Sequence, residues 1–214
     1  LGVVLSPTQW ENLEEQLITN SNFYRGNPKH SEMVTKVFDT DKGRFVYDTR
    51  RTTDSVYNSR GLATSQVITI EGAKLDDNGN EILDRNGKPA YEKLEQQTIV
   101  NDQGFVRNTP KHTLTETAFF NEGTGRFDKV GGQETFNYTF DGRGNVLTQK
   151  VIDFEIETNG ARTDVGYKTV ENRNVSFKGV AKESTVKNFY YDESGKAVFS
   201  DRQETVNARS DSRG

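Results

Sequence analysis

The chain has 214 residues, with 28 Lys or Arg against 32 Asp or Glu; the formal net charge of −4 and the absence of a basic pole disfavour a nucleic-acid partner. It has no cysteine, which excludes disulfides, thiolate metal sites and a cysteine nucleophile. Only 31% of the residues are hydrophobic, and Val, Ile, Thr, Tyr and Phe number 70 against 19 for Leu, Ala and Met. This β-branched and aromatic bias predicts an all-β chain with a thin core.

The N-terminal segment, residues 1–21, differs in pattern from the rest of the chain. Its longest apolar stretch, residues 1–5, is far shorter than the roughly 20 residues of a transmembrane helix, so we expect no membrane insertion. Residues 6–18 predict a short helix with Ser6 at its N-cap. The apolar face of this helix would hold Trp10, Leu13, Leu17 and Ile18. We expect it to cap the first open sheet edge; a partner-binding helix or a plug inside a shell are the alternatives.

A polar residue followed by glycine recurs along the chain at intervals of 35, 43, 40, 35 and 35 residues. These turn markers are Gly26, Gly61, Gly104, Gly144, Gly179 and Gly214. They divide residues 22–214 into a repeat array with units 26–60, 61–103, 104–143, 144–178 and 179–213. A second landmark keeps the same phase: a polar-Thr-apolar step followed within two residues by asparagine, at Asn101, Asn137, Asn172 and Asn207.

Each unit has a further turn signal near its midpoint, and the 43-residue unit has two. In each, Asp, Asn or Glu is followed three or four residues later by glycine, at 39–43, 76–79, 84–87, 121–125, 157–160 and 192–195. Glycine closes such hairpin loops at low steric cost. We therefore expect about ten strands of roughly 10–14 residues, arranged as tandem antiparallel hairpins in an elongated twisted meander. Charged residues fall on both faces, so neighbouring units must stabilise one another.

Three of these turns resemble the tyrosine-aspartate repeats of the Rhs family, in which an aromatic residue, an Asp or Asn and a Gly mark each hairpin. The turns are residues 57–62, 140–147 and 190–196. The resemblance implies long β-meanders that coil into shells or form secreted, wall-associated and adhesive proteins. The unit here is closer to 35 residues, which is more similar to the tandem segments of very large bacterial surface proteins. On this resemblance we expect a structural, filament-forming or adhesive module outside the cell or on its surface.

Candidate chemistry is sparse, and we expect no catalytic residues, no cofactor and no metal. His30 and His112 both stand in Pro-Lys-His, but two histidines among scattered carboxylates are a poor zinc set, and we expect both on the surface. The Asp-rich segments 39–43 and 76–81 fit hairpin turns better than calcium loops, although a weak calcium site stays open. A polysaccharide-acting protein is an alternative, and it would use the extra residues 76–89 and 121–133.

Binding through aromatic side chains is the second functional hypothesis. The candidate binding residues are Phe136, Tyr138, Phe189, Tyr190 and Tyr191. Exposed rings on a long sheet can stack on a glycan or contact a cell-surface protein, whereas cross-strand pairing within the sheet is the structural alternative. The last strand of an open meander also offers an unpaired edge, so other copies or adjoining repeats of the same protein are the first expected partners.

Overall fold

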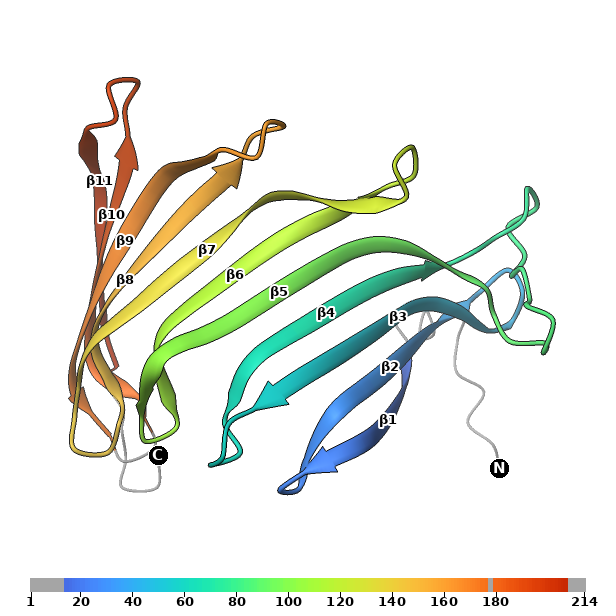
Figure 1. Cartoon of the computed structure of the whole chain (residues 1–214), viewed down its shortest axis with the longest axis horizontal. Helices are drawn as coiled ribbons and strands as arrows, with labels where there is room; N and C mark the ends of the chain where they lie inside the picture. The colour runs from blue at the N-terminus through green and yellow to red at the C-terminus, as the bar shows by residue number, and fades with distance from the viewer. Residues whose placement is uncertain (1–13, 177–178, 208–214) are drawn as a thin grey trace. The chain divides into compact units, whose positions relative to one another are not determined.

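The computed structural model describes residues 14–176 and 179–207. Every regular element in these ranges is a β-strand, and each strand lies beside its neighbours in sequence within one sheet (Figure 1). The strands are β1 (Glu14–Tyr24), β2 (Asn27–Asp39), β3 (Arg44–Tyr57), β4 (Ala63–Ala73), β5 (Tyr91–Val106), β6 (Thr109–Asn121), β7 (Arg126–Phe140), β8 (Val146–Ile156), β9 (Arg162–Val175), β10 (Ala181–Tyr191) and β11 (Ala197–Val206). The predicted all-β antiparallel meander is confirmed, with eleven strands in place of about ten.

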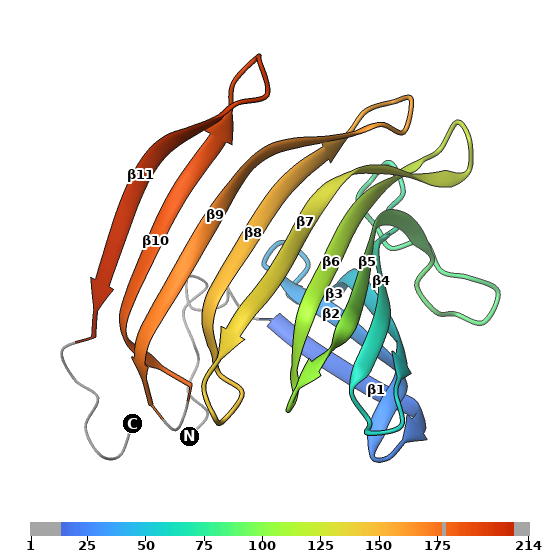
Figure 2. The same cartoon turned by 60° about the vertical axis from the view of Figure 1, so that its left-hand side comes forward.

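The chain divides into two compact units. The first holds the residues up to Gln97 together with Phe119–Asp128, and the second holds Thr98–Ala118 together with the residues from Lys129 onward. Strands β1 to β4 belong to the first unit and β8 to β11 to the second, where they lie side by side (Figure 2).

The predicted N-terminal helix is wrong where the structure describes its residues. Residues 6–13 lie outside the described range, but Glu14–Tyr24 forms β1, which crosses the expected boundary after residue 21. Leu17 and Ile18 pair with Val34 and Met33 of β2. Their spacing suits a helix face, but helix propensity is a weak preference, and ladder formation with β2 overrides it.

Hairpin turns occupy most of the predicted positions. The two-residue turn between β1 and β2 has φ of 50° at Arg25 and 82° at Gly26, the left-handed geometry that joins two twisted strands tightly. At Gly61, Gly144 and Gly179 the glycine N–H instead donates to the carbonyl three residues earlier. Gly104 differs, because it lies within β5 and the chain reverses only after Val106. Gly214 lies outside the described residues.

Turns about one repeat apart in the sequence are tied to one another by hydrogen bonds. Asn27, which follows the first marker, donates its side-chain amide to the carbonyl of Gly61 at 3.2 Å. Thr109, which follows the β5–β6 turn, donates its hydroxyl to the carbonyl of Gly144 at 3.0 Å. The partners are 34 and 35 residues apart, so turns about one repeat apart in the sequence contact each other in space.

The asparagine landmark has an equally regular role. Three of its members donate their side-chain amide to a backbone carbonyl of the preceding strand, 26 or 27 residues earlier. The pairs are Asn137 to Pro110 at 2.9 Å, Asn172 to Val146 at 3.1 Å and Asn207 to Ala181 at 2.7 Å. A repeated side-chain bond of this kind fixes the register of neighbouring strands without a hydrophobic core.

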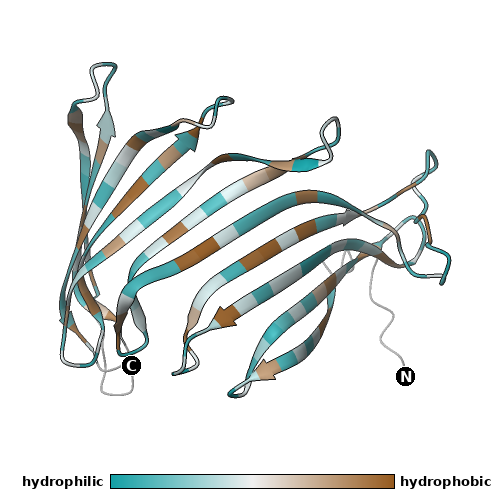
Figure 3. Cartoon of the chain, in the orientation of Figure 1, coloured by the Kyte–Doolittle hydropathy of each residue, from teal (hydrophilic) through white to brown (hydrophobic). Residues whose placement is uncertain are grey.

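The core is thin. Among the described residues, five hydrophobic side chains are buried: Ile68, Ala118, Val151, Ile152 and Phe154. Hydrophilic and hydrophobic residues alternate in short blocks along the strands, with no strand hydrophobic throughout (Figure 3). The sheet therefore relies on cross-strand pairs and on hydrogen bonds more than an ordinary domain does.

One packed spot in the second unit is centred on Phe154 of β8. A Cβ atom on Gly132 of β7 would lie 2.9 Å from Cζ of Phe154 and 2.0 Å from the carbonyl oxygen of Thr115. The ring therefore occupies space that only glycine leaves open. The guanidinium carbon of Arg162 lies 4.1 Å from the centre of the same ring. Phe154 is 4% exposed as a result.

Candidate functional site

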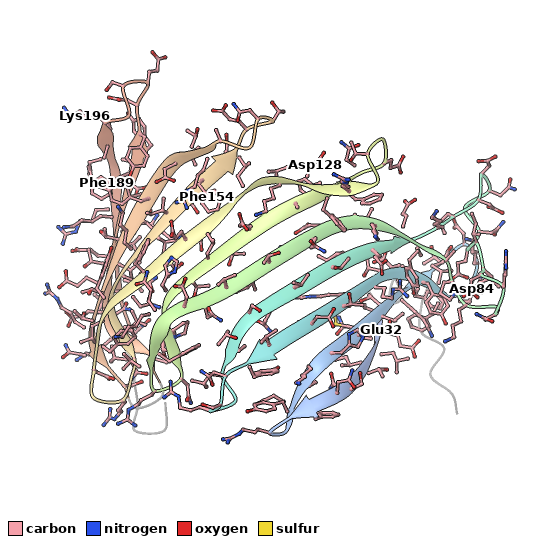
Figure 4. The ribbon with its side chains drawn as sticks, in the orientation of Figure 1. Glu32, Asp84, Asp128, Phe154, Phe189 and Lys196 are labelled. Atoms are coloured by element: carbon pink, nitrogen blue, oxygen red, sulfur yellow. The ribbon has the colours of Figure 1, made fainter. Side chains whose placement is uncertain are left out.

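A row of aromatic and basic side chains crosses the second unit from β6 to β11. The rings of His112 and Phe136 are 4.6 Å apart, and Phe136 pairs with Lys150 across the β7–β8 ladder. The Lys150 ammonium lies 4.2 Å from the ring centre of Tyr167. From Tyr167 the row continues to Phe189 at 4.6 Å and from Phe189 to Phe199 at 5.6 Å. We call these six side chains the cross-strand row; Figure 4 labels its member Phe189 on β10.

Most of the predicted binding residues belong to this row or pack beside it. Phe136 and Phe189 are members, Tyr191 packs against Tyr167 at 5.8 Å, and Tyr138 stacks on Phe136 at 6.3 Å. Tyr167 has Phe189 on one side and the Lys150 ammonium beside its ring, which leaves little ring face for a ligand. Tyr138 and Tyr190 keep about half or more of their surface exposed, at 60% and 49%. The rings thus serve first as cross-strand pairs.

A charged network begins at the β6 end of the row. His112, expected on the surface, is 6% exposed, because Phe136 packs against its ring. Its Nδ1 lies 2.5 Å from Oδ1 of Asp102, and its Nε2 lies 2.9 Å from Oε1 of Glu134. Both ring nitrogens therefore lie at hydrogen-bonding distance from a carboxylate oxygen. His30, by contrast, contacts a single carboxylate, that of Asp54, at 2.8 Å.

Glu134 connects His112 to Arg162 of β9, whose Nη2 donates to Oε2 of Glu134 at 2.7 Å. Burial opposes ionisation of Glu134, but the hydrogen bonds from Arg162 and His112 outweigh it and hold its pKa below the ordinary value. Burial likewise opposes the charge of Arg162, yet the bonds to Glu134 and Asp164 raise its pKa. Arg162 is paired with the carboxylates of Glu134 and Asp164, and Glu134 is held by two partners, an arrangement that suits a structural role better than proton transfer.

The acidic turn residues are engaged in holding the turns. Asp76 Oδ1 accepts the backbone N–H groups of Asn78 and Asn80, and Asp84 Oδ1 accepts those of Asn86 and Lys88. These backbone bonds hold the pKa of both carboxyls below the ordinary value. The same geometry recurs at Asp141 and Asp192. Within residues 14–176 and 179–207, no group of three or more His, Asp or Glu side chains is arranged to hold a metal ion.

The extra residues between β4 and β5 form two small turns, closed by bridges from Leu75 to Glu81 and from Leu83 to Pro89. Glu81 bonds to β3: its carboxylate accepts from Nη1 of Arg44 at 2.9 Å and from the backbone N–H of Tyr47 at 2.6 Å. The side chain of Glu81 is nearly buried, and both of its carboxylate oxygens accept hydrogen bonds from β3. The insertion therefore offers a poor site for acid–base catalysis.

An open groove in the second unit lies at the β9 start and the β10–β11 turn. It is lined by Arg162, Thr163, Asp164, Val165, Tyr191, Asp192, Glu193 and Gly195. Tyr191 is the predicted binding residue in this groove, where it stands with charged side chains of both signs. A ring beside carboxylates and a guanidinium is a polar, ring-stacking environment of the kind that hydroxyl-rich ligands use.

The outermost strands are the remaining candidate surface. Strand β1 pairs only with β2, and β11 pairs only with β10, among the described strands. On β1, Leu17, Ile18 and Phe23 are 60%, 58% and 61% exposed. On β11, Asp201, Arg202 and Glu204 alternate in charge along the edge. An unpaired strand with exposed apolar side chains is a template for strand addition.

Comparison with known proteins assigns no family. No protein-family model and no curated protein sequence matches the chain. Among solved structures, a crystal structure at 1.90 Å of a protein of unknown function from Bacteroides fragilis NCTC 9343 is similar, with 8% sequence identity and a TM-score of 0.34. The match covers 92% of this chain and 95% of that one. Within the described ranges no helix is long and apolar enough to cross a membrane.

Proposed function

We propose that this chain is a non-enzymatic structural repeat module that assembles through the open edges of its sheet. Its partners are other copies of the chain or adjoining repeats of the same protein. The module consists of five hairpin units of 35 to 43 residues in an elongated meander, as in the Rhs-type repeats that it resembles. On that resemblance it forms part of a large bacterial protein that is secreted or displayed at the cell surface.

One observation carries this proposal: the sheet ends at β1 and at β11 in strands with a single described partner each. Exposed strand edges drive association unless they are covered or blocked. The regular side-chain hydrogen bonds between neighbouring strands also support the proposal. A repeat array whose units stabilise one another becomes more stable when further units are added.

Sedimentation velocity over a wide concentration series, with electron microscopy of the same samples, tests the proposal. We expect the sedimentation coefficient to rise with concentration and ordered dimers or filaments to form. A single monomeric species at every concentration would contradict assembly as the function. The wild-type chain alone supplies both outcomes, so this test needs no variant.

A second candidate function is glycan binding, favoured by the groove that Tyr191 lines with Arg162, Asp164 and Asp192. Binding of a neutral oligosaccharide would require Tyr191 and would be lost in Tyr191→Ala. Tyr190→Ala provides the matched control, because Tyr190 is the adjacent ring, 49% exposed, and is not among the groove residues. An unchanged far-ultraviolet circular dichroism spectrum verifies that each variant folds. No retention on a glycan array by the folded wild type would remove this candidate.

A further inference from the structure

Two parallel rows of side chains cross strands β8 to β11 on one face of the second unit, where these strands lie side by side (Figure 2). Directly opposed residues of an antiparallel ladder lie on the same face. The ladders place four residues in the first row, which we call the acidic row: Thr148, Glu171, Thr185 and Glu204. The second, or basic, row is built in the same way: Lys150, Thr169, Lys187 and Arg202. On every strand the two rows are two residues apart, which is about 7 Å.

The surface is hollowed along these rows. A hollow of about 220 Å³ is lined by residues of β7 to β10, and another of about 310 Å³ is lined by residues of β9 to β11. Glu171, Thr185 and Lys187 line both, so the two hollows adjoin and form one polar depression, which we call the sheet-face groove. Neighbouring strands lie about 4.8 Å apart, so the groove extends about 19 Å from β7 to β11.

An exposed aromatic ring stands at the β7 end of the sheet-face groove. Tyr138 lines the groove and is 60% exposed. Its ring stacks on that of Phe136, with 6.3 Å between the ring centres and 7° between the ring planes, so packing holds it in place. A tyrosine ring combines a large apolar surface with a polar hydroxyl. Held in this way, it is a platform on which the apolar face of a sugar ring can stack.

We propose that the sheet-face groove binds an extended, uncharged polysaccharide chain with β-1,4 linkages, with one sugar ring stacked on Tyr138. This proposal goes beyond assembly, since it uses a face of the sheet and neither of its edges. A chain of this linkage is extended, as a groove that crosses five strands requires, whereas α-1,4-linked chains coil. The hydroxyls of Thr148, Thr169 and Thr185 line the groove beside the tyrosine.

The charges of the groove favour an uncharged, hydroxyl-rich occupant. Three acidic and three basic side chains line it: Glu171, Glu183, Glu204, Arg173, Lys187 and Arg202. A polyanion would meet the carboxylates, and a polycation would meet the ammonium and guanidinium groups. Carboxylates only accept hydrogen bonds, and lysine and arginine only donate them, whereas a sugar hydroxyl does both. A neutral polysaccharide can therefore bond to both rows.

The backbone disfavours a peptide strand as the occupant. Strands β8, β9 and β10 each pair with a strand on both sides, so their N–H and C=O groups are engaged in the ladders. A peptide that crossed them could not gain the main-chain hydrogen bonds on which strand addition depends. The groove offers side chains alone, which suits recognition through hydroxyl groups.

Affinity electrophoresis in native gels tests the proposal, with hydroxyethylcellulose as the neutral β-1,4-linked probe. We expect this polymer to retard the wild-type chain, and polygalacturonate, a polyanion, to leave its mobility unchanged. Titration calorimetry with cellohexaose then measures the affinity. Tyr138→Ala removes the platform and should weaken binding by about tenfold or more. Thr185→Gln lengthens a side chain that lines both hollows and should weaken binding by a similar factor. Tyr190→Ala is the matched control, because Tyr190 is 49% exposed on β10 and lines neither hollow.

The outcomes separate this inference from the proposed functions. Retardation that is lost in Tyr138→Ala and Thr185→Gln and kept in Tyr190→Ala supports the sheet-face groove. Binding that is lost in Tyr191→Ala and kept in Tyr138→Ala overturns the inference and leaves glycan binding at Tyr191. Retardation by polygalacturonate alone, or by neither polymer, overturns it as well. Each of these results leaves assembly in place, because sedimentation of the wild type measures assembly separately. Circular dichroism verifies the fold of each variant, and if Tyr138→Ala unfolds, Thr185→Gln decides.

Discussion

Truncation of Phe154 to alanine tests how a thin sheet holds its structure. The side chain is 4% exposed, fills the space above Gly132 and packs against the guanidinium of Arg162. Phe→Ala at buried sites costs about 3–5 kcal/mol of unfolding free energy. Because water reaches the faces of a thin sheet more easily than a closed core, we expect Phe154→Ala to cost about 3 kcal/mol, including the loss of the cation–π contact, about 0.5–1 kcal/mol.

Urea unfolding followed by far-ultraviolet circular dichroism measures this cost. Phe199→Ala is the matched control, because Phe199 belongs to the same unit but is 53% exposed and contacts one ring, that of Phe189. We expect it to cost about 1 kcal/mol. Phe154→Leu, which keeps an apolar side chain at the site, should cost about 1 kcal/mol as well. Equal losses of unfolding free energy from Phe154→Ala and Phe199→Ala would refute the claim that the residues packed around Phe154 form a local core.

Three further predictions concern the ties between strands. Asn172→Ala removes the bond to the carbonyl of Val146 and the bond accepted from Ser184, and should lower the unfolding free energy in urea by about 1–2 kcal/mol; no change would contradict a structural role for the asparagine landmark. Gly132→Ala should cost about 3 kcal/mol or more in the same assay, because its Cβ would lie 2.0 Å from a backbone carbonyl oxygen; a stable variant would show that the strands can separate there without loss. Glu134 has a lowered pKa in the folded chain, so its ionised form stabilises the fold above the ordinary glutamate value, about 4.3, and this contribution is lost as the pH falls through the lowered value. Glu134→Gln should therefore be less stable than the wild type at neutral pH, and the difference in urea midpoint should shrink on acidification; a difference independent of pH would exclude the ion network as its cause.

The spacing of glycines predicts the hairpins well because loop geometry is local. A glycine three or four residues after Asp or Asn can close a turn whatever surrounds it. Gly104 shows the limit of this rule, since the dipeptide Gln103-Gly104 has left-handed φ values of 55° and 82° and yet lies inside β5. Where strands can continue past such a site, pairing with neighbours decides where the chain turns.

The charged network around His112 was not predictable from spacing alone. Asp102, Glu134 and Arg162 come from β5, β7 and β9, and only the strand registers bring them together. One signal was present: Pro-Lys-His occurs twice, near the start of β2 and near the start of β6, so both histidines lie just inside a strand. What distinguishes buried His112 from more exposed His30 is the neighbouring Phe136, a long-range contact.

The N-terminal strand was missed for a related reason. Leu17 and Ile18 have helical spacing relative to Trp10 and Leu13, and an isolated edge strand has no alternating pattern to reveal it. Both faces of β1 are exposed, so neither face needs to be apolar. Among the described residues, Leu17, Ile18 and Phe23 of this strand stay more than half exposed.

Hydrogen–deuterium exchange of the edge strands β1 and β11 as a function of protein concentration tests the central claim, assembly through the open sheet edges, most directly. We expect peptides covering at least one of these strands to exchange rapidly in dilute solution and to become protected as the concentration rises. Exchange that stays equally rapid in both strands up to the highest concentration would contradict assembly.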